Sequence, residues 1–153
     1  MTFIVVKNEY EGILEGIRLV KEALDIGNKT IGFVAEPDYK DFYESLSKTD
    51  LDFSTLTAIN LSEYIGLEPS SIASYHYFMN KYLFDHKEFR EKFALNGKVN
   101  DFNEEIKRYN QIVDAHPIDL QFIGIGKNGR IGFNEPGTPI DIRTHVSDLT
   151  KST

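Results

Sequence analysis

Residues 118–137 read IDLQFIGIGKNGRIGFNEPG, an apolar run followed at once by a loop dense in glycine. The run from Ile118 to Ile125 is typical of a buried strand. In open α/β sheets, ligands bind in the crevice beyond the carboxyl ends of such strands. Glycine permits left-handed backbone and lets amide N–H groups approach an anion closely. The stretch therefore predicts a parallel sheet with a functional loop at its carboxyl edge.

Two generic nucleotide-binding motifs share the glycine spacing of this loop. Gly124, Gly126 and Gly129 spell G-x-G-x-x-G, but the dinucleotide motif needs a helix to begin at its third glycine. Gly132 and the residues after it break any helix there. The Walker A spacing also occurs, yet Arg130 stands where that motif requires lysine. A plain surface loop would explain the glycines but not the dense polar side chains between them.

Strand and helix patterns alternate along the chain, which predicts a three-layer α/β/α fold with an open, mostly parallel sheet of Rossmann-like topology. The expected strands are residues 2–6, 30–35, 56–61, 118–125 and 143–149, and the expected helices are residues 8–24, 37–46, 72–84 and 101–116. Asn8 is expected to cap the first helix, and Asp101 with Glu104 resembles a capping box for the last.

Composition excludes several function classes. The 153 residues suffice for one domain, and 41% apolar content is ordinary for a globular protein. A net charge of −7 disfavours nucleic-acid and membrane-surface partners, which would want a basic face. The chain has no cysteine and only four scattered histidines, so we expect no metal site and no thiol chemistry. The absence of cysteine fits a cytoplasmic location.

The loop resembles the signature G-x-G-x-[DN]-G-H-I-[AG]-F-N-E-P of the glucosamine-6-phosphate deaminase (isomerase) family. Residues 59–67, INLSEYIGL, are similar to that family's N-[ML]-D-E-Y-x-G-L, and residues 74–80, 95–97 and 143–146 match further blocks in order. The resemblance implies one deaminase-like domain over residues 1–153. Because the family chain continues past the equivalent of Thr153, we expect a fold truncated on its C-terminal side and a possible homo-oligomer that covers the exposed edge.

The resemblance also implies a reaction: conversion of an amino-sugar phosphate to a ketose phosphate and ammonia, in the hydrolase class, without a cofactor. Ser62 falls on the family's proton-transfer aspartate and Arg130 on its ring-opening histidine. Serine cannot take a proton from carbon unaided, and arginine stays protonated. Glu63 is adjacent to Ser62 and could replace the aspartate if the strand ends early. Asn128 and Glu135 match the family, and an Arg130–Glu135 ion pair is an alternative to a ligand role.

The expected substrate contacts lie in the same loop. They are Gly124, Gly126, Lys127, Gly129 and Asn134.

The family's small-residue phosphate loop is replaced by Glu36, Pro37 and Asp38, which would repel a phosphate. An acidic start to an ordinary helix explains these residues equally. We therefore expect weak or absent turnover, as in a pseudoenzyme. The alternatives are a non-catalytic module that binds a sugar phosphate or another anion, and an interaction protein with a vestigial cleft.

Overall fold

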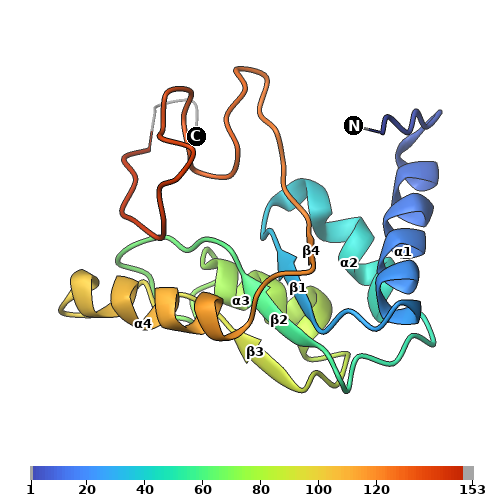
Figure 1. Cartoon of the computed structure of the whole chain (residues 1–153), viewed down its shortest axis with the longest axis horizontal. Coiled ribbons are helices and arrows are strands. Elements are labelled where there is room, and N and C mark those ends of the chain that lie inside the picture. Colours follow the sequence, from blue (N-terminus) through green and yellow to red (C-terminus); the bar gives the residue numbers. More distant parts are fainter. Residues whose placement is uncertain (1, 150–153) are drawn as a thin grey trace.

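The computed structural model describes residues 2–149, and it contains a parallel sheet flanked by helices (Figure 1). The strands are β1 (Thr30–Phe33), β2 (Thr57–Asn60), β3 (Glu91–Phe93) and β4 (Leu120–Gln121), in the order β3-β2-β1-β4. The helices are α1 (Glu9–Asp25), the 3₁₀ turn η1 (Pro37–Tyr39), α2 (Lys40–Ser47), α3 (Tyr75–Met79), the π-helical turn η2 (Asn80–Phe84) and α4 (Phe102–Ala115). All paired strands are parallel, which confirms the predicted fold class.

Helix α4 lies on the opposite face of the sheet from α2 and α3. The chain steps from β1 to β2 to β3 in one direction, then returns past β1 to β4. Because parallel crossovers are right-handed, the return connection must cross the other face. Figure 1 shows α4 running across the sheet with α2 and α3 on its far side. The three layers follow from this connectivity.

Local signals in the sequence explain both ends of α1. The Asn8 side chain accepts a hydrogen bond from the Glu11 N–H at 2.9 Å, as predicted. At the other end Gly27 has a φ of +84°, and the N–H of Asn28 donates to the carbonyl of Ala23 at 2.9 Å. This Schellman arrangement ends the helix because glycine alone adopts that conformation without strain.

The core lies between one face of the sheet and the helices α1, α2 and α3 that cover this face. Phe33 of β1 is fully buried, and its ring contacts Tyr43, Phe84, Phe89 and Phe122. The first three pairs are edge-to-face and the pair with Phe122 is stacked. Aromatic pairs of these kinds add about 0.5–1.5 kcal/mol each beyond the burial of their area. Helix α3 and the η2 turn also face this core, with Tyr75, Met79 and Leu83 buried.

Four predicted elements differ from the structure. Residues 2–6 and 143–149 form no strand in the described part of the chain, and no described strand lies beside them to pair with. The run 118–125 joins the sheet only at Leu120–Gln121, and Ile125 instead forms an isolated antiparallel bridge with Ile131 in the following loop. Ile125 is 72% exposed rather than buried. The third helix begins at Tyr75, three residues later than predicted. Strand β3 was not predicted, because three residues carry no alternation to recognise.

Candidate active site

The carboxyl ends of the parallel strands meet at one edge of the sheet. There β1 leads to Glu36, β2 leads to Ser62 and Glu63, and β4 leads to the signature loop, residues 124–137. The connection from β1 goes to β2 on one side, whereas β4 lies on the other side of β1. Such a reversal in strand order opens a crevice in which α/β proteins bind ligands. The fold therefore brings the segments that carry the predicted residues to the edge of the sheet where such crevices form.

The signature loop forms two successive tight turns and no helix. The Gly126 N–H donates to the Arg130 carbonyl at 2.7 Å, and Ile131 exchanges backbone hydrogen bonds with Asn134 at 3.0 and 2.9 Å. Gly129 and Gly132 have φ values of +87° and +57°, which other residues adopt with strain. The lack of a helix after Gly129 confirms that the glycine spacing is not a dinucleotide motif.

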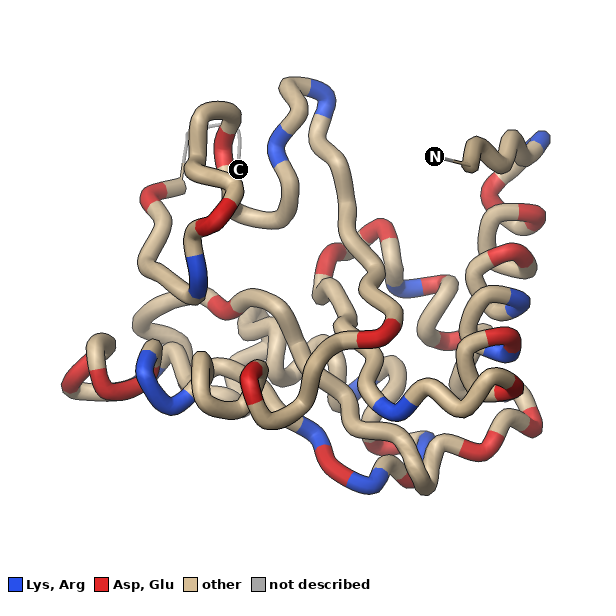
Figure 2. The backbone as a smooth tube through the Cα atoms, viewed as in Figure 1, with Lys and Arg blue, Asp and Glu red and all other residues tan. Residues whose placement is uncertain are grey.

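Asn128 organises the polar side chains of this loop. Its Nδ2 donates to Glu135 Oε2 at 2.8 Å, and its Oδ1 accepts from the backbone N–H of Arg130 at 3.1 Å. The Arg130 guanidinium donates through Nη1 to the carbonyl of Gly132. Lys127 is exposed at the tip of the turn. Figure 2 shows the basic residues on this loop and the acidic residues where the chain enters α2.

Glu63 is engaged by backbone groups at the start of α3. Its Oε1 accepts from the N–H groups of Tyr64 and Tyr75 at 2.8 and 2.9 Å, and its Oε2 accepts from that of His76 at 2.8 Å. The strand ends at Asn60, so the chain turns before Glu63 and brings this carboxylate toward α3. Ser62 lies between the strand end and Glu63, and its carbonyl accepts from Asn60 Nδ2 at 3.3 Å.

Three aromatic rings join the signature loop to the segment after β2. The ring of Phe133 stacks on Tyr75, with centroids 5.6 Å apart and planes 12° apart, and it lies 5.1 Å from Tyr64. Tyr64 and Tyr75 also contact each other at 4.9 Å. The contacts bring the segments that carry Ser62 and Arg130 against each other.

The electrostatics of Tyr75 place charged groups from two further segments nearby. Burial raises the pKa of Tyr75 well above its usual range, and its hydrogen bond with Tyr64 and the negative charge of Glu36 add to the rise. The positive charge of Arg130 lowers the same pKa. The Tyr75 hydroxyl is therefore under the influence of opposite charges from the segments that follow β1 and β4.

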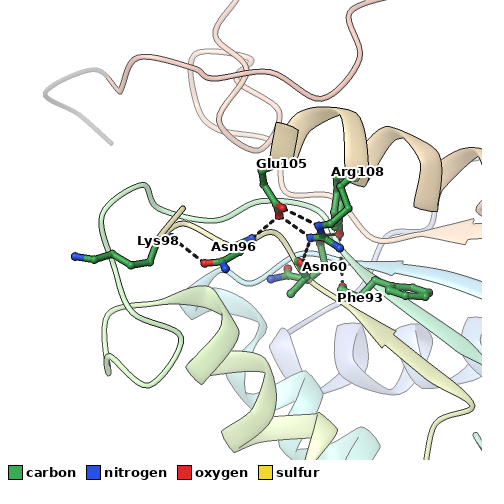
Figure 3. A network of polar contacts seen from close by, with 8 residues as sticks. Asn60, Phe93, Asn96, Lys98, Glu105 and Arg108 are labelled. Carbon is green, nitrogen blue, oxygen red and sulfur yellow. Dashed lines mark hydrogen bonds and ion pairs between the residues drawn. The ribbon is translucent and has the colours of Figure 1, made fainter. Parts of the chain in front are cut away.

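A second network fixes the segment after β2 from the side of α4 (Figure 3). Glu105 is only 7% exposed and accepts from the Asn96 N–H at 2.7 Å and from Arg108 Nε at 2.7 Å. The neighbouring Gly97 carbonyl accepts from the Gly66 N–H at 2.8 Å. Helix α4 therefore holds residues 94–97, which in turn hold the chain that carries Ser62 and Glu63.

Sequence reasoning missed several residues that shape this edge. Tyr75 was assigned to the core only, and Phe133 was read as part of a motif rather than as a contact. Asn60 is fully buried, and its Oδ1 has no hydrogen-bond partner within residues 2–149. The single available signal was the polar residue at the end of an otherwise apolar strand, IN at residues 59–60.

Residues 2–149 contain neither a candidate metal centre nor a helix that could span a membrane. No group of three or more histidine, cysteine, aspartate or glutamate side chains in that range is arranged to hold a metal ion. Within the same range, no helix combines the length and apolar character needed to cross a bilayer.

Comparison with known proteins gives consistent relatives. No family model matches the chain. Glucosamine-6-phosphate deaminases of Lactococcus lactis subsp. cremoris (strain SK11) and Streptococcus agalactiae serotype III (strain NEM316) are each 50% identical to it over 153 residues. The chain is covered completely but spans only 65% and 66% of these relatives. A solved monomeric glucosamine-6-phosphate deaminase superposes with a TM-score of 0.94 at 32% identity, over 99% of this chain and 66% of that one.

Proposed function

The chain belongs to the glucosamine-6-phosphate deaminase family, and we propose that it keeps the family's ligand crevice while releasing ammonia weakly or not at all. The proposal takes residues 1–153 as one domain whose partner is a small amino-sugar phosphate. The family supplies the ligand class, and the residues around the crevice supply the expectation of low turnover.

The engagement of Glu63 is the observation that carries the proposal. Deamination needs a group that removes a proton from carbon and a group that moves a proton to the ring oxygen. Ser62 stands at the first position, and a serine hydroxyl needs a neighbouring base to act. The adjacent carboxylate, Glu63, instead accepts three backbone N–H groups. The Glu63 carboxylate, the one base adjacent to Ser62 in the chain, is therefore already used in hydrogen bonds that stabilise the start of α3.

Arg130 supports the same conclusion at the second position. A guanidinium keeps its proton at any physiological pH and offers donors only. Its Nη1 already donates to the Gly132 carbonyl within its own loop. Arg130 can stabilise the loop or bind an oxygen of a ligand, but it cannot carry a proton to and from a ring oxygen.

The experiment restores both groups. Ammonia release from glucosamine 6-phosphate is measured by coupled assay for the native chain and for the double variant Ser62→Asp/Arg130→His. We expect background activity from the native chain and a gain of about 10²-fold or more in the double variant, because positioned acid–base groups contribute about 10²–10⁴-fold. The control is Ser62→Asn/Arg130→Gln, which has similar volumes but cannot transfer protons and should stay at background.

Two results would contradict the proposal. Native turnover of about 1 s⁻¹ or faster, the range of ordinary enzymes, would show that the replaced residues are not required. A native chain that binds sugar phosphates but loses that binding in Arg130→Ala, together with a double variant that gains no activity, would favour the non-catalytic anion-binding alternative, with Arg130 as the clamp.

A further inference from the structure

A cavity of about 280 Å³ lies between the η2 turn and β3, and none of its lining residues belongs to the signature loop. Strand β3 is at the edge of the sheet (Figure 1), so no further described strand closes this side. The η2 turn is π-helical, and the Asp85 N–H donates to the carbonyl of Asn80 at 3.0 Å. Turns of this kind are rare and occur frequently at functional sites. The wall of the cavity is therefore of a type that often accompanies a ligand.

Two oppositely charged residues line this cavity without pairing with each other. Asp85 follows η2 and Lys92 lies on β3, so the two charges come from different walls. Within residues 2–149 the Asp85 carboxylate makes no hydrogen bond and no ion pair, and the only hydrogen bond of Lys92 Nζ goes to the carbonyl of Phe84, at 3.1 Å. An ammonium group has further donors to offer. Unpaired opposite charges around one cavity are complementary to a ligand that carries both charges.

The remaining polar residues and the size of the cavity narrow the class of ligand. His76 and Asn80 also line it, and within residues 2–149 neither side chain makes a hydrogen bond. Imidazole and amide groups both donate and accept, so they suit a polar ligand of either kind. Pockets for drug-sized ligands measure about 300–1,000 Å³, so a cavity of about 280 Å³ suits a smaller molecule, of the size of an amino acid.

From this arrangement we infer a second ligand site, which takes a small zwitterion such as a free α-amino acid. The ammonium group of the amino acid donates to the Asp85 carboxylate, and its carboxylate accepts from Lys92 Nζ. His76 and Asn80 supply further donors and acceptors. The site is separate from the crevice and does not depend on whether the crevice releases ammonia.

His76 connects this site to the crevice. It lines the cavity, and its backbone N–H donates to Glu63 Oε2 at 2.8 Å. A ligand in the cavity therefore changes the environment of an amide group that holds the Glu63 carboxylate. The amide signal of His76 reports on binding for this reason.

The test uses L-asparagine and two fragments of it that each lack one charge. Succinamate lacks the ammonium group, and β-alaninamide lacks the carboxylate. Chemical-shift titrations of the amide signals at neutral pH give the dissociation constants. We expect the native chain to bind L-asparagine about tenfold more tightly than either fragment, because each fragment loses one charge-assisted hydrogen bond. The shifts should centre on His76 and Ala94 rather than on the signature loop.

Two variants match the two fragments. Asp85→Asn should weaken the binding of L-asparagine and β-alaninamide about tenfold but change that of succinamate, which has no ammonium group, by less than about twofold. Lys92→Gln should weaken L-asparagine and succinamate and spare β-alaninamide, and glutamine can still donate to the Phe84 carbonyl. The controls are Glu88→Gln and Lys48→Gln, which remove exposed charges outside the cavity and should change each constant by less than about twofold.

Four outcomes would overturn the inference: no saturable shift with L-asparagine, equal binding of L-asparagine and both fragments, equal effects of Asp85→Asn on L-asparagine and succinamate, or shifts confined to the signature loop. The last would place the ligand in the crevice. Because the readout is binding at the cavity, failure of this inference is distinguishable from failure of the proposed function, which is measured by ammonia release.

Discussion

Replacing Glu105 by Gln tests the network that holds the β2 segment from the side of α4. The carboxylate accepts from Asn96 N–H at 2.7 Å and from Arg108 Nε and Nη2 at 2.7 and 2.6 Å. Glutamine has nearly the same volume and keeps one acceptor for Asn96. It loses the negative charge and presents an NH₂ group to Arg108, which has no acceptor to offer in return.

The expected loss of stability follows from these contacts. A hydrogen bond to a charged group contributes about 1.5–3 kcal/mol. Arg108 is 46% exposed, so water screens its charge and favours the lower end of that range. Its Nη2 also keeps the Ala94 carbonyl at 3.1 Å. We therefore expect Glu105→Gln to lower the free energy of unfolding by about 1.5 kcal/mol.

The pKa of the Glu105 carboxylate determines how this loss of stability depends on pH. Burial alone would raise the pKa of Glu105, but hydrogen bonds from Arg108 and the Asn96 N–H, with the Arg108 charge, hold it below its usual value of 4.5. A lowered pKa in the folded state contributes stability that is fully present above the unfolded value and is lost as the pH falls through the folded value. The difference between native chain and variant should be complete at neutral pH and should shrink below about pH 4.5.

Urea unfolding at pH 7 and at pH 3.5 measures both effects. The matched control is Glu104→Gln, which removes an exposed carboxylate from the same helical turn and should change stability by less than about 0.5 kcal/mol. If Glu105→Gln costs no more than Glu104→Gln at pH 7, the buried network does not stabilise the fold. If its cost is the same at both pH values, the carboxylate charge is not the source of the effect.

Two further substitutions test contacts around the same segment. Gly97→Ala should destabilise the fold by about 1–3 kcal/mol in urea unfolding, because a Cβ would overlap the backbone carbonyl oxygen of Tyr64. The control is Gly12→Ala in α1, where the nearest atom lies 3.7 Å from the added Cβ, and this variant should stabilise the fold by about 0.5–1 kcal/mol. Equal effects of the two substitutions would refute the steric argument. Tyr109→Phe should cost about 1–2 kcal/mol in thermal unfolding, since its buried hydroxyl donates to the Asn60 carbonyl, and a neutral result would mean that another donor replaces it.

Helices and their ends could be predicted from the sequence because their signals are local. The Asn8 cap and the Gly27 terminus of α1 each depend on residues within one turn. The Asp101 cap of α4 accepts from the N–H groups of Asn103 and Glu104, as its position predicted. The reciprocal half of the expected capping box does not form among the described residues, because the Glu104 side chain is exposed and accepts no hydrogen bond from the Asp101 N–H.

Strand extent could not be predicted, because pairing depends on distant partners. The apolar run 118–125 has the composition of a buried strand, yet only Leu120–Gln121 pairs with β1, and Ile125 pairs instead with Ile131 in the following loop. Strand β3 shows the reverse case. Its three residues have no pattern of their own, and they become a strand because β2 pairs with them from Thr57 to Ile59.

The roles of single site residues depend on the same distant contacts. Glu63 could be assigned only to the neighbourhood of Ser62, because the sequence does not show that α3 returns to bind its carboxylate. The acidic turn at Glu36 could be recognised as hostile to phosphate, but its approach to Gly124 joins residues that are far apart in the chain. The role of a charged residue therefore depends on which distant groups the fold places in contact with it.

The positions that depart from the family chemistry lie on three different segments and meet at one edge. Glu36 follows β1, Ser62 follows β2 and Arg130 lies in the loop after β4. None of them belongs to the buried core, which is formed by residues of the strands and the helices that cover them. In a parallel sheet the residues beyond the strand ends can therefore change charge and proton-transfer capacity while the packing that positions them stays the same. This separation is consistent with a TM-score of 0.94 to a solved deaminase at only 32% sequence identity.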